Sequence, residues 1–255
     1  MRTHIHPDYW MYRGFIESIP KGEYVRAEVF CNHRNIVEKV EWGTKTFVVK
    51  KYKRPTWVNS IVYTWFRDTK ARRAYEHAIE LQRRGIGTAQ PVAYIEMFKY
   101  GFFHTGYFIS EYLPYPLIRD LRKGQFTQKE KQEVGEALIA FTAQLHTQGI
   151  VPKDYNSGNI FFHKEGEKYR FALIDINRIR IGQIPQERDS TQFFDQLGIN
   201  ISKAIHFIDQ YATLRGFNTD RCIFYILCHR AKKKIERQIK KYILHPIRTT
   251  PKAIS

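Results

Sequence analysis

Three oxygen-bearing side chains stand at a spacing that suits phosphoryl transfer. Asp154 precedes Asn159 by five residues, and Asp175 ends a short apolar run. Asp154 could accept the proton of a substrate hydroxyl. Asn159 and Asp175 could hold Mg²⁺, a cation that prefers oxygen ligands. The metal would bridge the phosphates of a nucleotide and offset charge as the phosphoryl group moves.

The residues between these side chains predict how they come together. Two short apolar runs, 160–162 and 171–174, flank a polar stretch that contains a glycine, which is typical of a hairpin. A hairpin would place Asn159, just before the first strand, beside Asp175, just after the second. The alternative is that Asp154 and Asn159 are ordinary turn residues, since Asp, Asn, Ser and Gly all favour turns.

The segment from Val151 to Asn177 resembles the catalytic loop and metal-binding Asp of the protein-kinase-like superfamily. With its short N-terminal half and its ending Ile-Asp-Ile-Asn-Arg-Ile-Arg, the chain most resembles the lipopolysaccharide core kinases of bacteria (Kdo/WaaP-like). Those enzymes phosphorylate heptose or Kdo sugars with ATP. The resemblance covers about residues 25–210. It implies that Asp154 is the catalytic base, that Asn159 and Asp175 bind Mg²⁺, and that ATP is the phosphoryl donor.

The upstream half supplies a candidate phosphate-binding lysine. Two alternating segments, 36–42 and 46–52, predict a pair of strands joined by a turn. Lys50 shares a strand face with Val48, because side chains alternate with period two. In the kinase pattern this face points to the nucleotide, so Val48 would touch the adenine and Lys50 the phosphates. The adjacent Lys51 is the alternative, and both lysines could be ordinary strand-end residues.

A helix glutamate is the expected partner of that lysine. Residues 69–84 predict a helix that stops at Gly85. The kinase pattern pairs a glutamate of such a helix with the strand lysine. Its position relative to Gly85 favours Glu76 over Glu80, one turn later. The alternative is that Glu76 is a surface glutamate.

A proline-rich stretch predicts the hinge between two lobes. Residues 92–97 and 106–110 predict two further strands, and the second runs into the segment 111–116. Its two prolines limit further strand pairing. Backbone N–H and C=O groups at Glu111 and Leu113 would then be free to bind the adenine edge. The alternative is a simple connection between a strand and a helix.

Further features support the same pattern. Thr127 and Glu130 fit a capping box at the start of an amphipathic helix. Asp195 resembles the buried Asp that supports the catalytic loop in kinases, although it could equally lie on a helix surface. Arg178 and Arg180, close behind the metal-binding Asp, could bind an anionic sugar or screen the site.

The chain departs from the kinase pattern in three places. Pro152 replaces the usual loop-orienting His, and the nucleotide-covering stretch 30–35 has no glycine. Glycines let a backbone approach phosphates closely. Asn tolerates similar angles, and Arg34 could contact phosphate directly. The metal position at 175–177 contains Asp-Ile-Asn instead of Asp-Phe-Gly, which resembles small-molecule kinases.

The predicted fold is α+β and two-lobed, like that of protein kinases. Residues 1–110 would form a small N-terminal lobe, an antiparallel sheet with one helix. Residues 111–116 would be the hinge. Residues 117–255 would form a larger, mainly helical lobe with the catalytic loop, the metal site and a basic C-terminal helix. A chain of 255 residues can bury a core of this kind.

Composition predicts a cytoplasmic protein. The hydrophobic content of 43% favours a folded chain. No apolar run approaches the ~18–20 residues that span a bilayer, and the N-terminus has no apolar signal region. Three cysteines do not make a disulfide framework.

The net charge of +17 predicts an anionic partner. The basic segment 229–243 carries an apolar stripe of Ile235, Ile239, Tyr242 and Ile243. Such a helix could lie on the inner face of the bacterial inner membrane, where each cation contributes about 1 kcal/mol. The alternative is a helix packed on the large lobe with a solvated charged face. Nucleic acid is not an expected partner, because no nucleic-acid-binding motif is present.

The resemblance implies an ATP-dependent kinase that phosphorylates a sugar hydroxyl of the lipopolysaccharide core, Kdo or heptose. A protein Ser/Thr kinase is disfavoured by the missing Ala-Pro-Glu segment. A small-molecule kinase of the aminoglycoside or choline type would have the same Asp and Asn spacing. An inactive pseudokinase that acts as a binding module is favoured by Pro152 and the glycine-free loop, but disfavoured by the intact Asp154, Asn159 and Asp175.

Overall fold

A computed structural model describes residues 1–32 and 35–244, and for residues 201–203 and 243–244 it describes the backbone alone. Contacts divide the chain into two compact units. The first consists of Met1–Phe126, Pro152–Asp154 and Gly158–Arg180, and the second of Thr127–Val151, Tyr155–Ser157 and the chain from Ile181 onward.

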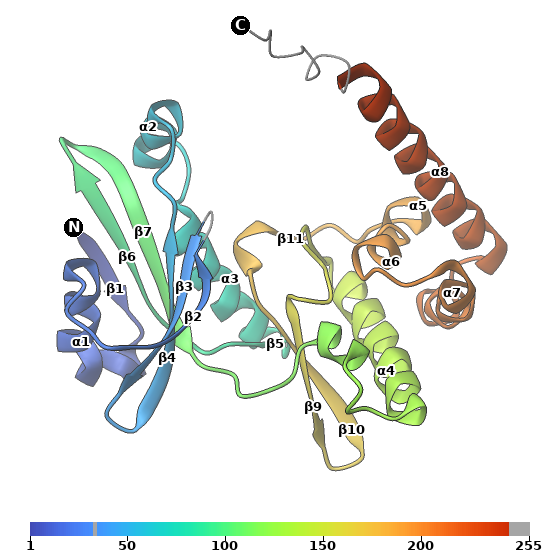
Figure 1. Ribbon diagram of the computed structural model, residues 1–255, viewed down its shortest axis with the longest axis horizontal. Helices are drawn as coiled ribbons and strands as arrows, with labels where there is room; N and C mark the ends of the chain where they lie inside the picture. Colours follow the sequence, from blue (N-terminus) through green and yellow to red (C-terminus); the bar gives the residue numbers. More distant parts are fainter. Residues whose placement is uncertain (33–34, 245–255) are drawn as a thin grey trace, which may run out of the picture. The chain divides into compact units, whose positions relative to one another are not determined.

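Six strands form one antiparallel sheet in the first unit, in the order β1-β6-β7-β4-β3-β2 (Figure 1). They are β1 (Arg2–Ile5), β2 (Arg26–Asn32), β3 (Asn35–Trp42), β4 (Lys45–Tyr52), β6 (Pro91–Lys99) and β7 (Phe102–Glu111). β3 pairs with β4 and β6 with β7, as expected for strands joined by short turns. These four strands were predicted from the sequence, whereas β1 and β2 were not.

The core of the first unit holds β4 in position. Phe47 and Val49 are almost fully buried, while Val48 and Lys50, which alternate with them, are only half-buried. The Phe47 ring stacks on Phe15, with ring centroids 5.2 Å apart. Burial of such side chains stabilises the fold by about 1.5–3 kcal/mol each. One face of β4 is therefore anchored in the core, and the other carries Val48 and Lys50.

The first unit also contains several helices. They are the 3-10 helices η1 (Pro7–Tyr12), η2 (Ile19–Lys21), η3 (Ile118–Arg122) and η4 (Ile176–Arg178), and the α-helices α1 (Arg13–Ser18), α2 (Trp57–Trp65) and α3 (Lys70–Arg83). α3 packs on β6 and β7. Its N-cap is Thr69, whose hydroxyl accepts the N–H of Arg72 at 3.2 Å and donates to the buried carboxylate of Glu96 at 2.7 Å.

A second, small sheet carries the segment that was predicted to be a hairpin. Its order is β5-β10-β9, formed by β5 (Gly87–Thr88), β9 (Ile160–Glu165) and β10 (Lys168–Leu173). β9 and β10 are antiparallel and β5 runs parallel to β10. The predicted hairpin is confirmed. Two short strands, β8 (Ile150–Pro152) and β11 (Ile179–Ile181), complete the strands of the described residues.

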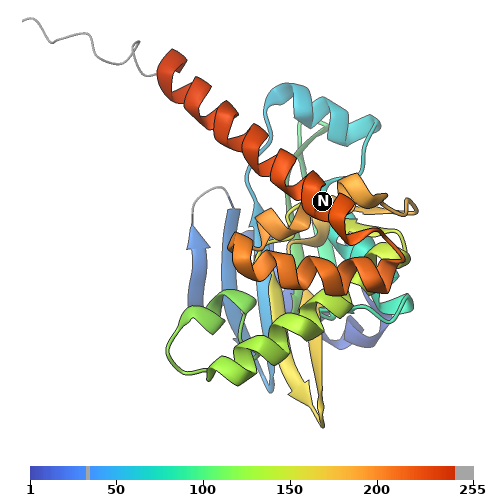
Figure 2. The same cartoon turned by 90° about the vertical axis from the view of Figure 1, so that its right-hand side faces the viewer.

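The second unit is helical. Its helices are α4 (Gln128–Thr147), α5 (Glu187–Ser190), α6 (Phe193–Gln196), α7 (Ile201–Arg215) and α8 (Thr219–Leu244). α4 lies beside α7, as Figure 2 shows in green and orange. The capping box predicted for Thr127 and Glu130 is confirmed, with Thr127 N–H donating to the Glu130 carboxylate at 2.7 Å.

Buried aromatic side chains hold α4, α6 and α7 together. His146 of α4 hydrogen-bonds the hydroxyl of Tyr211 at 2.6 Å. The Phe193 ring lies against both, with centroids 5.5 Å from His146 and 5.1 Å from Tyr211. Burial, together with the positive charge of Arg215, lowers the pKa of His146 from 6.5 to about 3, so this imidazole is neutral in the folded protein.

No helix within residues 1–32 and 35–244 combines the length and apolar character that crossing a bilayer requires.

Candidate active site

The β9–β10 hairpin brings two predicted metal ligands to one end of the small sheet. Ile160 pairs with Leu173 at that end. One residue further out, the N–H of Ile174 donates to the carbonyl of Asn159 at 2.9 Å. Asn159 and Asp175 are therefore neighbours, although they are sixteen positions apart in the sequence.

Asp175 has an unusual backbone conformation for a residue with a side chain. Its φ is 56° and its ψ 42°, the left-handed region. Outside glycine, Asn and Asp are among the residues that adopt this region most readily. The conformation turns the chain directly from β10 into η4 and presents the carboxylate to Lys50, whose Nζ lies 2.5 Å from its Oδ1.

Lys50 reaches Asp175 from the half-buried face of β4, and its side chain is 14% exposed. Burial lowers its pKa, but the nearby Tyr52 and the Asp175 carboxylate outweigh that effect and raise the pKa above its usual value. The ammonium is therefore charged at neutral pH. Lys51 instead lies exposed, over the ring of Tyr107 at 5.5 Å. The geometry thus favours Lys50 over Lys51 as the phosphate lysine.

Asp154 is held by several contacts. Its carboxylate accepts hydrogen bonds from Arg178 Nη1 at 3.3 and 3.5 Å. Its backbone carbonyl accepts the side-chain Nδ2 of Asn159 at 2.9 Å. The preceding residue, Lys153, donates its backbone N–H to the carbonyl of Arg178 at 3.3 Å. Asp154, Asn159 and Arg178 therefore form one connected group.

Asp154 and Asp175 line the same cavity, which has a volume of about 380 Å³ and lies wholly within the first unit. Four cations line it with them: Lys53, Arg54, Lys70 and Arg178. The cavity therefore has more positive than negative side chains. The sequence had suggested Arg178 as a substrate contact, but Lys53, Arg54 and Lys70 were missed because nothing in their spacing marks them as neighbours of Asp154.

The donor set at the hairpin suits Mg²⁺. Asn159 uses its Nδ2 to reach the Asp154 carbonyl, which leaves its amide oxygen for a cation. The Asp175 carboxylate supplies further oxygens, and hard cations prefer such ligands. Asn177, two residues on, is buried and its Oδ1 is without a hydrogen-bond partner among the described residues. The residues therefore fit a magnesium ion, held by Asn159 and Asp175.

The structure differs from the prediction for Glu76. Glu76 is exposed and its carboxylate pairs with Arg72 on the same helix at 2.7 Å, while Lys50 pairs with Asp175. The physical reason is proximity, since residues four apart on a helix are neighbours. On α3 the residue that reaches the metal segment is His77, whose Nδ1 lies 2.7 Å from the carbonyl of Ile176. This contact was not foreseen.

The hinge segment agrees with its prediction only in part. The N–H groups of Glu111 and Tyr112 are already bonded, to Gln90 and Thr46 at 2.9 and 3.0 Å. The prediction of a free N–H group is therefore wrong for Glu111, because β7 continues to pair as far as this residue. The Glu111 side chain forms an ion pair with Lys45 at 2.5 Å. Leu113 and Val48 are half-buried.

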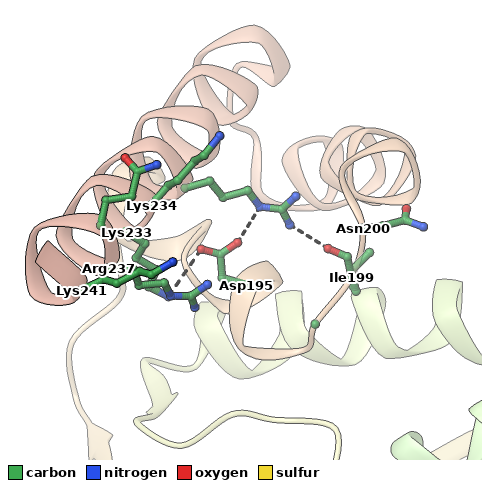
Figure 3. Close-up of a pocket in the computed structure, with 10 residues that line it drawn as sticks. Asp195, Ile199, Asn200, Lys233, Lys234, Arg237 and Lys241 are labelled. Atoms are coloured by element: carbon green, nitrogen blue, oxygen red, sulfur yellow. Dashed lines mark hydrogen bonds and ion pairs between the residues drawn. The ribbon is translucent and has the colours of Figure 1, made fainter. Parts of the chain in front are cut away.

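Two further predictions concern Arg34, in the nucleotide-covering stretch 30–35, and Asp195. Arg34, which was expected to contact phosphate, lies outside the described residues. The Asp195 carboxylate binds Arg230 at 2.6 Å and Lys233 at 3.5 Å on α8 (Figure 3). Instead, the neighbouring Gln196 accepts the backbone N–H of Tyr155, the residue after Asp154, at 2.8 Å. In the described structure, Gln196 thus makes the backbone contact that had been assigned to Asp195.

The chain was compared with known proteins. A family profile described as the lipopolysaccharide kinase (Kdo/WaaP) family matches residues 23–212. A comparison with curated protein sequences finds no match. A solved structure of WaaP in complex with acyl carrier protein is similar with a TM-score of 0.61 and 17% identity, over 92% of this chain and 99% of that one.

A second similar structure comes from Ralstonia eutropha and is described as a candidate aminoglycoside phosphotransferase. It has a TM-score of 0.54 and 12% identity, over 84% of each chain. At these identities the two structures support the fold alone. They confirm the predicted α+β kinase-like fold, and the family match confirms the predicted family and the phosphotransferase class.

Proposed function

Because this chain belongs to the lipopolysaccharide kinase (Kdo/WaaP) family, we propose that it transfers the γ-phosphate of ATP to a hydroxyl of a lipopolysaccharide core sugar. Kdo, a sugar acid, is our first choice, and heptose is the second. The observation that carries this proposal is the single cavity lined by Asp154, Asp175 and four cations.

We assign the roles as follows. Asp154 accepts the proton of the attacking hydroxyl, and Arg178 holds the Asp154 carboxylate in place. Lys50 binds the nucleotide phosphates. Asn159 and Asp175 hold Mg²⁺, which offsets the charge of those phosphates when it is bound.

We place the adenine between Val48 and the hinge. Val48 would contact the base, and the Glu111 carbonyl and the Leu113 N–H would bind its edge. This proposal follows from the half-buried position of all three residues and from the Glu111 N–H being engaged elsewhere.

The positive charge of the cavity favours an anionic acceptor over a cationic one. Lys53, Arg54 and Lys70 are more cations than the nucleotide site needs, and they would repel a cationic acceptor such as an aminoglycoside or choline. A carboxylated sugar would be attracted instead. The burial of Lys70 and the nearby cations Arg73 and Arg178 lower its pKa. An anion is therefore the ligand that best relieves this crowding of positive charge.

We also propose that the distal half of α8 contributes to membrane contact. Its first half packs on α5 and α7 and buries Cys222 and Ile226. Further along, Ile235, Ile239 and Tyr242 are exposed among cations. The side chain of Ile243 lies outside the described set.

The test is phosphate transfer with Mg²⁺ and ATP, measured on lipid-linked acceptors that end in Kdo or carry heptose. We expect transfer to the Kdo acceptor, no transfer to an aminoglycoside, and a loss of about 10²–10⁴-fold in Asp154→Ala. Asp8→Asn, an exposed carboxylate change, is the control. Transfer that survives in Asp154→Ala would refute the base assignment, and transfer to the aminoglycoside would refute the acceptor class.

A further inference from the structure

Helix α2 leaves three of its apolar side chains exposed, those of Trp57, Val58 and Trp65, while Ile61, Val62 and Tyr63 are half-buried. Six of its nine residues are apolar or aromatic, yet none is buried. The hydroxyl of Ser60 donates to the Phe103 carbonyl, and the Phe103 N–H donates to the Thr64 hydroxyl at 2.9 Å. A helix of a soluble domain normally packs with its apolar face inward. α2 is attached to β7 by these hydroxyl groups and by the Tyr63 ring, which packs edge-on against Phe103, so the exposed side with Trp57, Val58 and Trp65 is available to a partner.

The exposed face continues onto the turn between β6 and β7. Trp57, Trp65 and Phe66 are 77%, 62% and 79% exposed. Trp65 packs edge-on against Phe102, with ring centroids 5.4 Å apart. We call this surface the α2 patch and define it by its exposed residues Trp57, Val58, Trp65, Phe66, Tyr100 and Phe102. β7 begins at this turn, and α2 packs on β7 (Figure 1).

Cations predominate around the α2 patch, and the nearest carboxylate in the sequence, Asp68, is paired with Arg72 at 3.1 Å. The segments 53–67 and 98–104 contain Lys53, Arg54, Arg67 and Lys99 and no Asp or Glu. Arg54 and Lys99 line a hollow of about 510 Å³ together with Trp57 and Tyr100. In the same hollow the pKa of His104 is lowered by burial and then by Arg54 and Lys99. Aromatic side chains set among cations match the headgroup level of an anionic bilayer, where Trp and Tyr are enriched.

The α2 patch is joined to the candidate active site through one short helix. Asn59 and Tyr63 of α2 line the cavity that contains Asp154 and Asp175. Trp57, Val58 and Trp65 project from the other side of the same helix, because residues two apart lie on different faces. A surface that held these aromatic side chains would therefore hold the cavity close to it.

We propose that the α2 patch docks the protein on an anionic phospholipid bilayer and so places the cavity at the membrane surface. Trp57, Trp65 and Phe66 enter the interface between headgroups and acyl chains, and Lys99 and Arg67 bind the anionic headgroups. The consequence for acceptor choice rests on the proposed function. The docking itself does not, because it requires neither nucleotide nor acceptor.

The experiment is co-sedimentation of the full chain with vesicles of phosphatidylglycerol or phosphatidylcholine. We expect binding to phosphatidylglycerol that falls about tenfold or more in Trp57→Ser/Trp65→Ser, because two large aromatic contacts are lost. Lys99→Glu should also bind more weakly than the wild type, and this difference should grow as the salt concentration is lowered, because screening decreases. Both tryptophans are exposed, so the melting temperature should not change.

Two matched controls locate the contact. Trp10→Ser removes an exposed tryptophan elsewhere in the first unit and should keep full binding. Ile235→Ser/Ile239→Ser removes apolar side chains of α8, for which we propose a smaller contribution, and should weaken binding less than Trp57→Ser/Trp65→Ser does. Vesicle binding that persists in Trp57→Ser/Trp65→Ser, or disappears only in the α8 variant, would overturn the proposal.

Other results are equally decisive. A wild-type protein that ignores vesicles but forms dimers, which Trp57→Ser/Trp65→Ser abolishes, would make the α2 patch an interface between copies and overturn the proposal. A wild-type protein that neither binds vesicles nor dimerises would also overturn it. Vesicle binding without any phosphate transfer would support docking while the proposed function fails.

Discussion

At the scale of single residues, the candidate site depends on shared partners. Asn159 contacts Asp154 through its amide nitrogen and neighbours Asp175 through its backbone, so it links the proposed base to the proposed metal. Arg178 similarly holds the Asp154 carboxylate. A substitution at either Asn159 or Arg178 should therefore disturb Asp154 as well, and single-variant effects here will not be additive.

Lys50 and Lys51 are adjacent lysines on opposite faces of β4, so the same substitution at each of them tests which one binds phosphate. We expect Lys50→Met to weaken ATP affinity roughly 10- to 100-fold, because a charge-assisted hydrogen bond contributes about 1.5–3 kcal/mol. Lys51→Met should leave affinity unchanged, since Lys51 is exposed on the other face of β4. Fluorescent nucleotide titration would measure both. Equal losses in the two variants would contradict the assignment.

At the scale of elements, the small sheet sets the position of the two proposed metal ligands, Asn159 and Asp175. β5 lies against β10 with almost no space between them, since a Cβ on Gly87 would meet the Phe171 carbonyl oxygen at 2.2 Å. This close approach fixes β10, and β10 in turn fixes Asp175. Gly87 thus helps to position Asp175 through β10, without contacting Asp175 itself.

The close contact at Gly87 can be tested directly. We expect Gly87→Ala to lower the free energy of unfolding by about 1–3 kcal/mol, because β5 and β10 must move apart. Gly124→Ala is the control, since a Cβ there meets nothing within 4 Å. Urea unfolding would measure both. A Gly87→Ala protein as stable as the wild type would show that β5 can move freely.

The pairing of α4 with α7 should depend on pH through His146. Its pKa is lowered to about 3 in the fold, so between pH 6.5 and 3 the unfolded chain binds a proton that the folded chain does not. Stability contributed by neutral His146 is therefore complete above about pH 6.5 and is lost as pH falls. We expect a loss of about 1.5–2 kcal/mol between pH 6.5 and 5.

The measurement for His146 is urea unfolding at both pH values. His146→Gln should remove most of this pH-dependent loss, whereas His206→Gln, which changes an exposed imidazole, should retain it. If His146→Gln and the wild type lose equal stability, another group is responsible.

Elements with a strong periodic pattern were predicted well from the sequence. β3, β4, α3, β6, β7, α4 and the β9–β10 hairpin all follow apolar spacing or turn residues that act locally. No element was predicted at α2, although its apolar residues at 57, 58, 61, 62 and 65 recur at helical spacing. Glu76 was assigned the wrong partner because spacing fixes a helix face but does not decide between Arg72 and Lys50.

At the scale of the whole molecule, all predicted site residues fall in the first unit. This unit combines the nucleotide-side residues of β4 with the β9–β10 hairpin, although more than a hundred positions separate Lys50 from Asp154. The division into lobes at a hinge of residues 111–116 stays a prediction. The contacts group the hairpin with the large sheet in one compact unit.

The net charge of +17 leads to a prediction about salt. Docking by exposed cations is screened as the Debye length falls from about 10 Å at 0.1 M to about 3 Å at 1 M. We expect transfer to a vesicle-embedded acceptor to fall several-fold over this range relative to transfer to a soluble acceptor. Turnover of the two acceptors measured in parallel would check this. A constant ratio would contradict it.

The left-handed backbone at Asp175 limits what can stand at this position over evolution or in a mutant library. With a φ of 56°, a β-branched or bulky side chain would be strained whatever its chemistry. Glycine would fit but supplies no oxygen, and asparagine fits but carries no charge. Aspartate is the residue that satisfies both the shape of the turn and the demand for an anionic ligand. The backbone conformation alone therefore limits position 175 to a few residue types, independently of any requirement of catalysis.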